Sequence, residues 1–121
     1  MILINSVSYD EESREADVKL TSMGASIVCY CHPAENLDQI YKSIKNPLVA
    51  FLVSNIMVDN DNVYKIQKTN HGYYSYFLCG KVISNTKIQV EDFIIEIGAL
   101  PNDIEIGKYV SCYCLRLDIM I

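Results

Sequence analysis

Polar and apolar residues alternate strictly from Glu15 to Thr21, and this is the clearest periodic signal in the chain. Ala16, Val18 and Leu20 fall on one side of an extended chain, and the polar residues between them fall on the other. A period of two with one polar side predicts a strand of an antiparallel sheet that covers a core with one face. Apolar runs precede and follow this strand, so the first 32 residues predict a three-stranded meander.

A helical period replaces the alternation after Pro33. Apolar residues then recur at the spacing i, i+3, i+4 and i+7, at Leu37, Ile40, Tyr41 and Ile44. Asn36 or Asp38 is suited to cap the start of such a helix, because either side chain accepts hydrogen bonds from free backbone N–H groups. Pro47 ends the helix, since the residue before a proline is disfavoured in helical conformation.

The segment 48–58 fits two patterns. Leu48, Phe51 and Leu52 suit a helix, whereas Val49 and Val53, together with later β-branched residues, suit a strand. The length and the period favour the helix. We therefore predict a helical insertion around residues 36–58.

The second half of the chain returns to strand patterns. We expect strands over 63–68, 73–84, 87–90, 93–97 and 108–119. Gly80 interrupts the longest of them, where a β-bulge or a sharp bend is expected. The apolar positions of the expected strands give the candidate core: Val18, Leu20, Ile27, Cys29, Cys31, Leu78, Val82, Ile95, Ile97, Val110, Cys112 and Cys114.

Seven or eight strands with one helical insertion predict a mainly β fold, a small closed or partly open antiparallel barrel in a single domain over 1–121. The tail from Leu100 to Val110, Leu-Pro-Asn-Asp-Ile-Glu-Ile-Gly-Lys-Tyr-Val, resembles the end of an OB-fold barrel. There a last strand that begins at glycine closes the barrel after a proline-containing turn. The resemblance concerns the C-terminal third and implies an OB-like barrel, a fold that hosts many unrelated functions.

Composition narrows the class of protein. The 121 residues are 50% apolar, which excludes intrinsic disorder. The formal net charge of −5 argues against a general nucleic-acid coat and against binding to anionic membranes. No apolar run reaches the roughly 18 residues of a membrane span, and the first residues lack a basic signal-peptide region. We therefore expect a cytoplasmic protein.

The five cysteines fit a reducing compartment, because their number is odd and they lie in apolar strand patterns rather than in loops. Four of them form two Cys-Tyr-Cys triplets, Cys29 to Cys31 and Cys112 to Cys114. A zinc site that also uses His32 is conceivable. However, residues i and i+2 of a strand stand roughly 6.5–7 Å apart, too far for one tetrahedral zinc. We expect core packing, and neither a metal nor another cofactor.

No assembled catalytic motif is present. The sequence has no serine in a nucleophile elbow and no glycine-rich phosphate loop. His32 and His71 stand at a strand end and in a turn, where surface histidines are common. We therefore predict that the protein is not an enzyme.

The function that fits best is a non-catalytic interaction module with an acidic surface and another protein as its partner. Nine tyrosines support this, because tyrosine is enriched at interfaces. We expect the partner-binding face to carry Asp10, Glu11, Glu12, Glu15 and Asp17. An immunity-like or antitoxin-like protein that neutralises a basic partner is one form of such a module. An uncapped edge strand such as Ile2–Tyr9 also makes an oligomer possible.

Single-stranded nucleic-acid binding is the alternative, although the net charge disfavours it. The segment 62–90 holds four lysines and no acidic residue, interleaved with aromatic residues. Lysines suit phosphates and ring faces suit bases, so the candidate contact residues are Lys65, Lys68, Tyr73, Tyr76 and Lys81. This alternative requires these side chains to project from one face.

Overall fold

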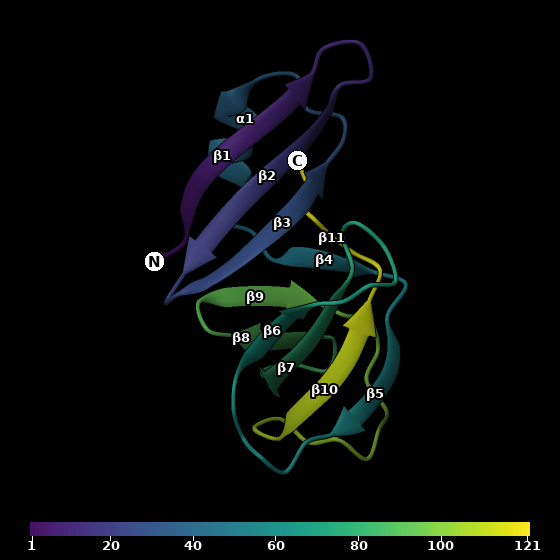
Figure 1. Ribbon diagram of the computed structural model, residues 1–121. Helices are drawn as coiled ribbons and strands as arrows, with labels where there is room; N and C mark the ends of the chain where they lie inside the picture. The colour runs from purple at the N-terminus through teal and green to yellow at the C-terminus, as the bar shows by residue number, and fades with distance from the viewer.

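A computed structural model describes residues 1–121 and shows a mainly β protein with one short helix (Figure 1). The elements in chain order are β1 (Leu3–Asp10), β2 (Glu15–Ser22), β3 (Ala25–Cys31), α1 (Leu37–Ser43), β4 (Leu48–Phe51), β5 (Ser54–Val58), β6 (Lys65–Lys68), β7 (Tyr76–Val82), β8 (Lys87–Val90), β9 (Phe93–Glu96), β10 (Tyr109–Cys114) and β11 (Arg116–Asp118). The mainly β class predicted from the sequence is confirmed.

The N-terminal meander forms as predicted. β1 pairs with β2 and β2 pairs with β3, both antiparallel. Along β2 the side chains alternate between buried and accessible, with Val18 and Leu20 fully buried. The pairing of β1 shifts register once, between Ile4 and Ser6, so its regular stretch runs from Ser6 to Asp10. One face of the meander therefore covers the core, and the other faces solvent.

The expected helical insertion over 36–58 is not confirmed, because only Leu37–Ser43 is helical. Asn36 caps this helix by accepting a hydrogen bond from the Gln39 N–H at 3.0 Å. No helix in the structure has the length and apolar character that crossing a membrane requires.

The segment 48–58 forms β4 and β5 instead of a helix. β4 pairs with β9 and β11, and β5 pairs with β10. Leu52 and Asn55 have positive φ angles of 52° and 55°, which are incompatible with a regular helix. Backbone hydrogen bonds to strands distant in sequence therefore outweigh the weak local helical period.

All eleven strands belong to one mixed sheet that does not close. The strands follow the order β1-β2-β3-β11-β4-β9-β8-β7-β10-β5. β6 lies outside this order and pairs with β7. β11 runs parallel to β3, and β4 runs parallel to β9. The predicted closed or partly open antiparallel barrel, and its OB-like form, are thus not confirmed. A C-terminal strand enters the sheet beside β3, and such a long-range pairing leaves no periodic signal in the sequence.

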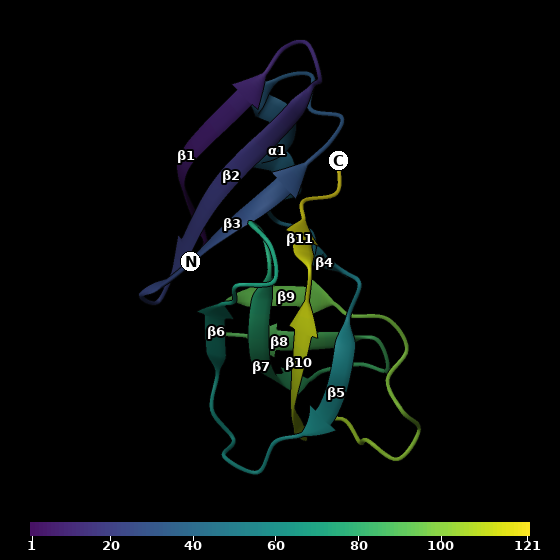
Figure 2. The same cartoon turned by 45° about the vertical axis from the view of Figure 1, so that its right-hand side comes forward.

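Two bent segments run side by side along the molecule (Figure 2). In one segment β4 continues into β5 past Leu52 and Val53, and in the other β10 continues into β11 past Leu115. The Leu115 N–H donates to the Phe51 carbonyl oxygen at 2.9 Å between the two bends. The bent segments connect the meander and α1 at one end of the molecule to β6–β9 at the other.

One continuous core of 23 buried residues extends through both ends of the molecule. All twelve core positions predicted from the sequence are buried, including the four cysteines of the Cys-Tyr-Cys triplets. Tyr76 also lies in this core, 4% exposed, and its hydroxyl oxygen accepts a hydrogen bond from the Val28 N–H at 2.8 Å. This bond joins β7 to β3.

Gly80 stands where β7 passes close to β8. The β7–β10 pairing shows no register shift at Gly80, so the expected bulge is absent there. A Cβ at this position would lie 2.6 Å from the Gln89 carbonyl oxygen and 2.7 Å from Val90 Cγ2. Only glycine leaves room for the backbone of β8.

We expect Gly80→Ala to lower the free energy of unfolding by about 2–3 kcal/mol, because the backbone of β8 has to move to admit the methyl group. Urea denaturation measures the change. Gly72→Ala is the matched control, since a Cβ there meets Leu115 at an ordinary 3.5 Å. Equal stability of the two variants would contradict the close approach.

Candidate functional site

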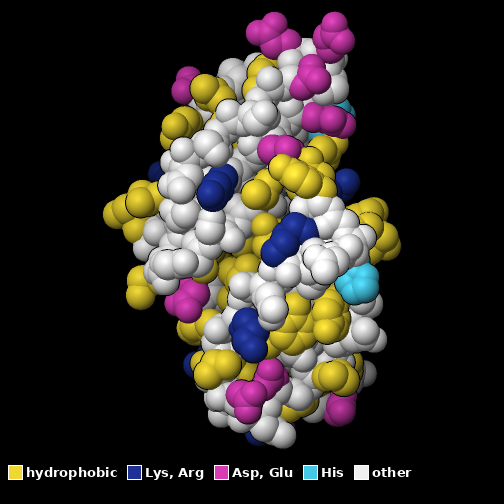
Figure 3. All heavy atoms as spheres, viewed as in Figure 1, with side chains coloured by type: hydrophobic (Ala, Val, Ile, Leu, Met, Phe, Trp, Pro, Cys, Tyr) yellow, Lys and Arg dark blue, Asp and Glu magenta, His cyan; other side chains and the backbone are white.

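The predicted acidic residues gather where β1 turns into β2. The register places Asp10 opposite Glu15 and Ser8 opposite Asp17, so these four side chains share the solvent face of the meander. Glu11 and Glu12 lie exposed in the turn between the strands. Figure 3 shows the acidic side chains collected at this end of the molecule, next to hydrophobic ones. The five acidic residues predicted for a partner-binding face thus lie together.

The turn that presents Glu11 and Glu12 is held by the Asp10 side chain. Its Oδ1 atom accepts a hydrogen bond from the Glu12 N–H at 2.9 Å and a longer one from the Ser13 N–H at 3.4 Å. Arg14 closes the turn with a positive φ of 56°, and its N–H donates to the Asp10 carbonyl oxygen at 2.8 Å. The acidic turn is therefore an ordered feature.

Tyrosines from two other elements complete this face. Tyr30 on β3 donates its hydroxyl proton to Glu15 Oε1 at 2.9 Å. Tyr74, in the segment before β7, donates to Asp17 Oδ1 at 2.5 Å. Desolvation and these hydrogen bonds raise the pKa of both phenols, so both remain protonated donors at neutral pH.

The tyrosine rings also contact one another. The Tyr74 ring packs edge-on against Tyr73, with ring centroids 4.7 Å apart, and against Tyr30 at 5.9 Å. We call the set Asp10, Glu15, Asp17, Tyr30, Tyr73 and Tyr74 the acidic tyrosine surface. A hollow of about 350 Å³ opens within it, lined by Ser8, Tyr9, Asp10, Glu15, Asp17 and Tyr74.

Arg116 stacks on the ring of Tyr30 and holds its orientation. Its guanidinium lies 4.4 Å from the Tyr30 ring centroid and 4.7 Å from that of Phe51. Asp118 holds the guanidinium in a bidentate pair, with Nε–Oδ1 at 2.6 Å and the second nitrogen–oxygen contact at 3.0 Å. The carboxylates and the rings are therefore ordered before any partner binds, which lowers the entropy cost of association.

The sequence did not identify Tyr30 and Tyr74 as members of this site. Tyr30 lies in the centre of a Cys-Tyr-Cys triplet, and the outward direction of that central residue is the signal that would have found it. Tyr74 is 57 residues from Asp17, and no local pattern indicates their contact.

The residues predicted to bind nucleic acid do not share one face. Lys65 lies opposite Cys79 in the β6–β7 pairing and shares the outer face with Lys81. Lys68 lies opposite Tyr76, on the core side, and its Nζ donates to the carbonyl oxygens of Thr69 and Gly72. The ring of Tyr76 is buried, so no base can stack on it. Tyr73 is exposed, but it belongs to the acidic tyrosine surface.

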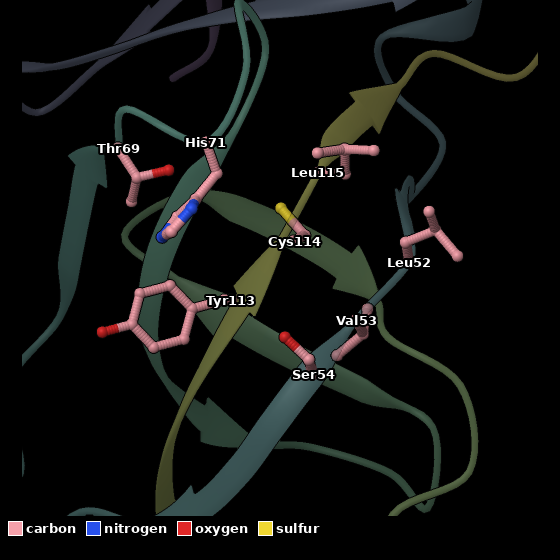
Figure 4. A pocket seen from close by; sticks show the side chains of 8 residues that line it. All are labelled: Leu52, Val53, Ser54, Thr69, His71, Tyr113, Cys114 and Leu115. Atoms are coloured by element: carbon pink, nitrogen blue, oxygen red, sulfur yellow. The ribbon is translucent and has the colours of Figure 1, made fainter.

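A second cavity, of about 400 Å³, opens where the two bent segments change direction (Figure 4). It is lined by Leu52, Val53, Ser54, Thr69, His71, Tyr113, Cys114 and Leu115. The ring of His71 packs edge-on against Tyr113, with centroids 6.4 Å apart. Cys114 is 3% exposed, and burial raises the pKa of its thiol to about 11. The cavity suits a small apolar group and offers no thiolate nucleophile at neutral pH.

All five cysteines are free and buried. Desolvation raises the pKa of every thiol, to about 11 for Cys79 and about 12 for Cys112. Cys79 also donates a hydrogen bond to Asp59 Oδ2 at 3.3 Å. Cys29, Cys31, His32, Cys112 and Cys114 do not form a metal-binding group, since no three His, Cys, Asp or Glu side chains converge for one.

Comparison of this chain with protein-family models, with curated proteins and with solved structures finds no match.

Proposed function

We propose that the protein is a non-catalytic binding module that holds a basic protein partner on the acidic tyrosine surface. The observation that carries this proposal is the ordered contact of two tyrosine hydroxyls with two carboxylates on one exposed face. Tyrosine contributes large contact area at low entropy cost, and it is enriched among the residues that dominate binding energy.

The charges of this face support a basic partner. Asp10, Glu11, Glu12, Glu15 and Asp17 supply five negative charges within one end of the meander, in a chain of net charge −5. An acidic patch speeds encounter with a basic protein and repels nucleic acid and other acidic proteins. An immunity-like or antitoxin-like protein that neutralises a basic partner in the cytoplasm fits this arrangement.

We also propose that the end of the molecule opposite the meander is a small OB-like barrel. The path β4-β9-β8-β7-β10-β5 begins and ends on the same bent segment, because β5 continues β4. The strand path therefore curls back on itself, which supports a barrel at this end of the molecule. The meander then forms a separate docking face at the other end.

Reversing the charge of the face tests the proposed function. We expect the double variant Glu15→Lys/Asp17→Lys to lose at least about tenfold in affinity for the partner, since it breaks both tyrosine contacts and removes the attraction. Affinity capture from the native cell lysate followed by mass spectrometry identifies the partner, and calorimetry with the purified partner measures the loss. Salt should weaken the wild-type complex.

Asp103→Lys/Glu105→Lys is the matched control, because it changes the net charge equally at exposed positions outside the face. This control should bind as the wild type does. Equal binding by Glu15→Lys/Asp17→Lys, or capture of an acidic partner, would refute the proposal.

A further inference from the structure

Three strands of the sheet pair on one side only: β1, β5 and β6. Free strand edges attract other strands, and proteins usually blunt them with short length, bulges, lysine or proline. The three edges of this protein differ in that respect.

Two of the free edges are protected. β6 has four residues, and lysines stand at both of its ends, Lys65 and Lys68. β5 has five residues and is distorted by the positive φ of Asn55 and by a register shift opposite Ser111 and Tyr113. Neither edge offers a regular row of free backbone groups.

β1 is less protected, since it carries only one register shift, between Ile4 and Ser6. It has eight residues and no lysine, arginine or proline, and its only charged residue is Asp10 at its end. After the irregularity at Ile4–Ser6, the stretch Ser6–Asp10 pairs regularly with β2. Its outer edge therefore offers free N–H and C=O groups in the spacing that another strand needs.

From this contrast we propose that β1 pairs antiparallel with β1 of a second copy of this chain, about a two-fold axis at Ser8. The side chains of Ser6–Asp10 are complementary to themselves in that register. Val7 faces Tyr9 of the other copy on the core side, where both are now partly exposed. An aromatic residue opposite a β-branched one is a favourable cross-strand pair.

The solvent side of this pairing is also compatible. Ser8 faces Ser8 of the other copy, and Ser6 faces Asp10, so hydroxyl groups meet a hydroxyl or a carboxylate. The two Asp10 residues lie four residue steps apart, about 13 Å, which exceeds the screening length of about 8 Å at physiological salt. A second copy therefore fits this edge in spite of the net charge of −5.

The product is a dimer with a continuous six-stranded sheet, β3-β2-β1 of one copy followed by β1-β2-β3 of the other. The acidic tyrosine surfaces of both copies lie on the same face of this sheet. A rotation about a two-fold axis normal to the sheet maps each face of the sheet onto itself. The proposal concerns the association of the chain with itself and does not depend on the partner of the proposed function.

Cysteine cross-linking tests the register. Residues directly opposite in an antiparallel pair have Cα atoms about 4.5–5.5 Å apart, within the range that a disulfide spans. We expect Ser8→Cys to form a covalent dimer upon mild oxidation with oxidised glutathione. Ser6→Cys is the control, since the two copies of residue 6 lie about 13 Å apart. The five native thiols are buried and do not compete.

Light scattering of the unmodified protein should give twice the monomer mass at tens of micromolar. Ser8→Lys should weaken the dimer by roughly tenfold, because two lysines then face each other. Ser54→Lys, the same change at an exposed position of β5, should leave the dimer intact. A monomer at this concentration, equal cross-linking at residues 6 and 8, or a dimer unaffected by Ser8→Lys would each overturn the proposal.

Discussion

Val110→Asp should leave the protein unfolded at room temperature. Val110 is fully buried in β10, between Gly80 of β7 and Val58 of β5. A carboxylate placed there loses its hydration and gains no partner, which costs several kcal/mol. The whole stability of a domain is roughly 5–15 kcal/mol, so this one substitution removes much or all of it. Far-ultraviolet circular dichroism and urea denaturation measure the loss.

Met57→Asp provides the control for this result. Met57 lies on β5, the strand next to Val110, and is 61% exposed. Its replacement should change the free energy of unfolding by less than about 0.5 kcal/mol. A cooperative unfolding transition of Val110→Asp at the wild-type urea midpoint would show that β10 faces the core with its other side.

Raising the pH from 8 to 10 should destabilise the protein by a few kcal/mol, even under reducing conditions. The pKa of each thiol is raised in the folded state, so the folded protein keeps protons that the unfolded chain releases above pH 9. The stabilisation is complete below about pH 9 and is lost as the pH rises through the folded pKa values, which are about 11 for Cys79 and Cys114 and about 12 for Cys112. Each of these three thiols accounts for a loss of about 1 kcal/mol between pH 8 and pH 10.

Urea denaturation at pH 8, 9 and 10 measures this slope. Cys79→Ala removes one of the five thiols and should reduce the pH dependence, whatever it does to the stability at pH 8. A stability that stays constant from pH 8 to 10 would show that the thiols are solvated in the folded protein.

Local patterns predicted those parts of the fold that local physics determines. The alternation along β2 gave the strand, its buried side and the meander, because one face of that strand contacts the core and the other contacts water. The helix cap was narrowed to Asn36 or Asp38, since capping depends on residues three positions apart, and the structure shows that Asn36 is the cap. The segment 48–58 was assigned wrongly because its backbone partners lie in β9, β10 and β11, far along the chain.

The candidate site also has a part that local sequence predicts and a part that depends on long-range contacts. Its acidic half was visible in the sequence, because Asp10, Glu15 and Asp17 lie on strands joined by one short turn. Its tyrosine half depends on the contact between Tyr74 and Asp17, which exists only after β7 has packed beside the meander. The basic segment 62–90 shows the opposite case, in which neighbours in the sequence, Lys65 and Lys68, project from opposite sides of one strand.

The position of β11 also bears on the synthesis of the protein. β11 lies between β3 and β4, and 88 residues separate Tyr30 from its partner Asp118. The meander leaves the ribosome before β11 does, so one side of β3 has no neighbour until β11 has emerged. Such non-local pairing slows folding and leaves the nascent chain prone to aggregate. We therefore expect chaperone dependence to be strongest while residues 32–118 are being translated.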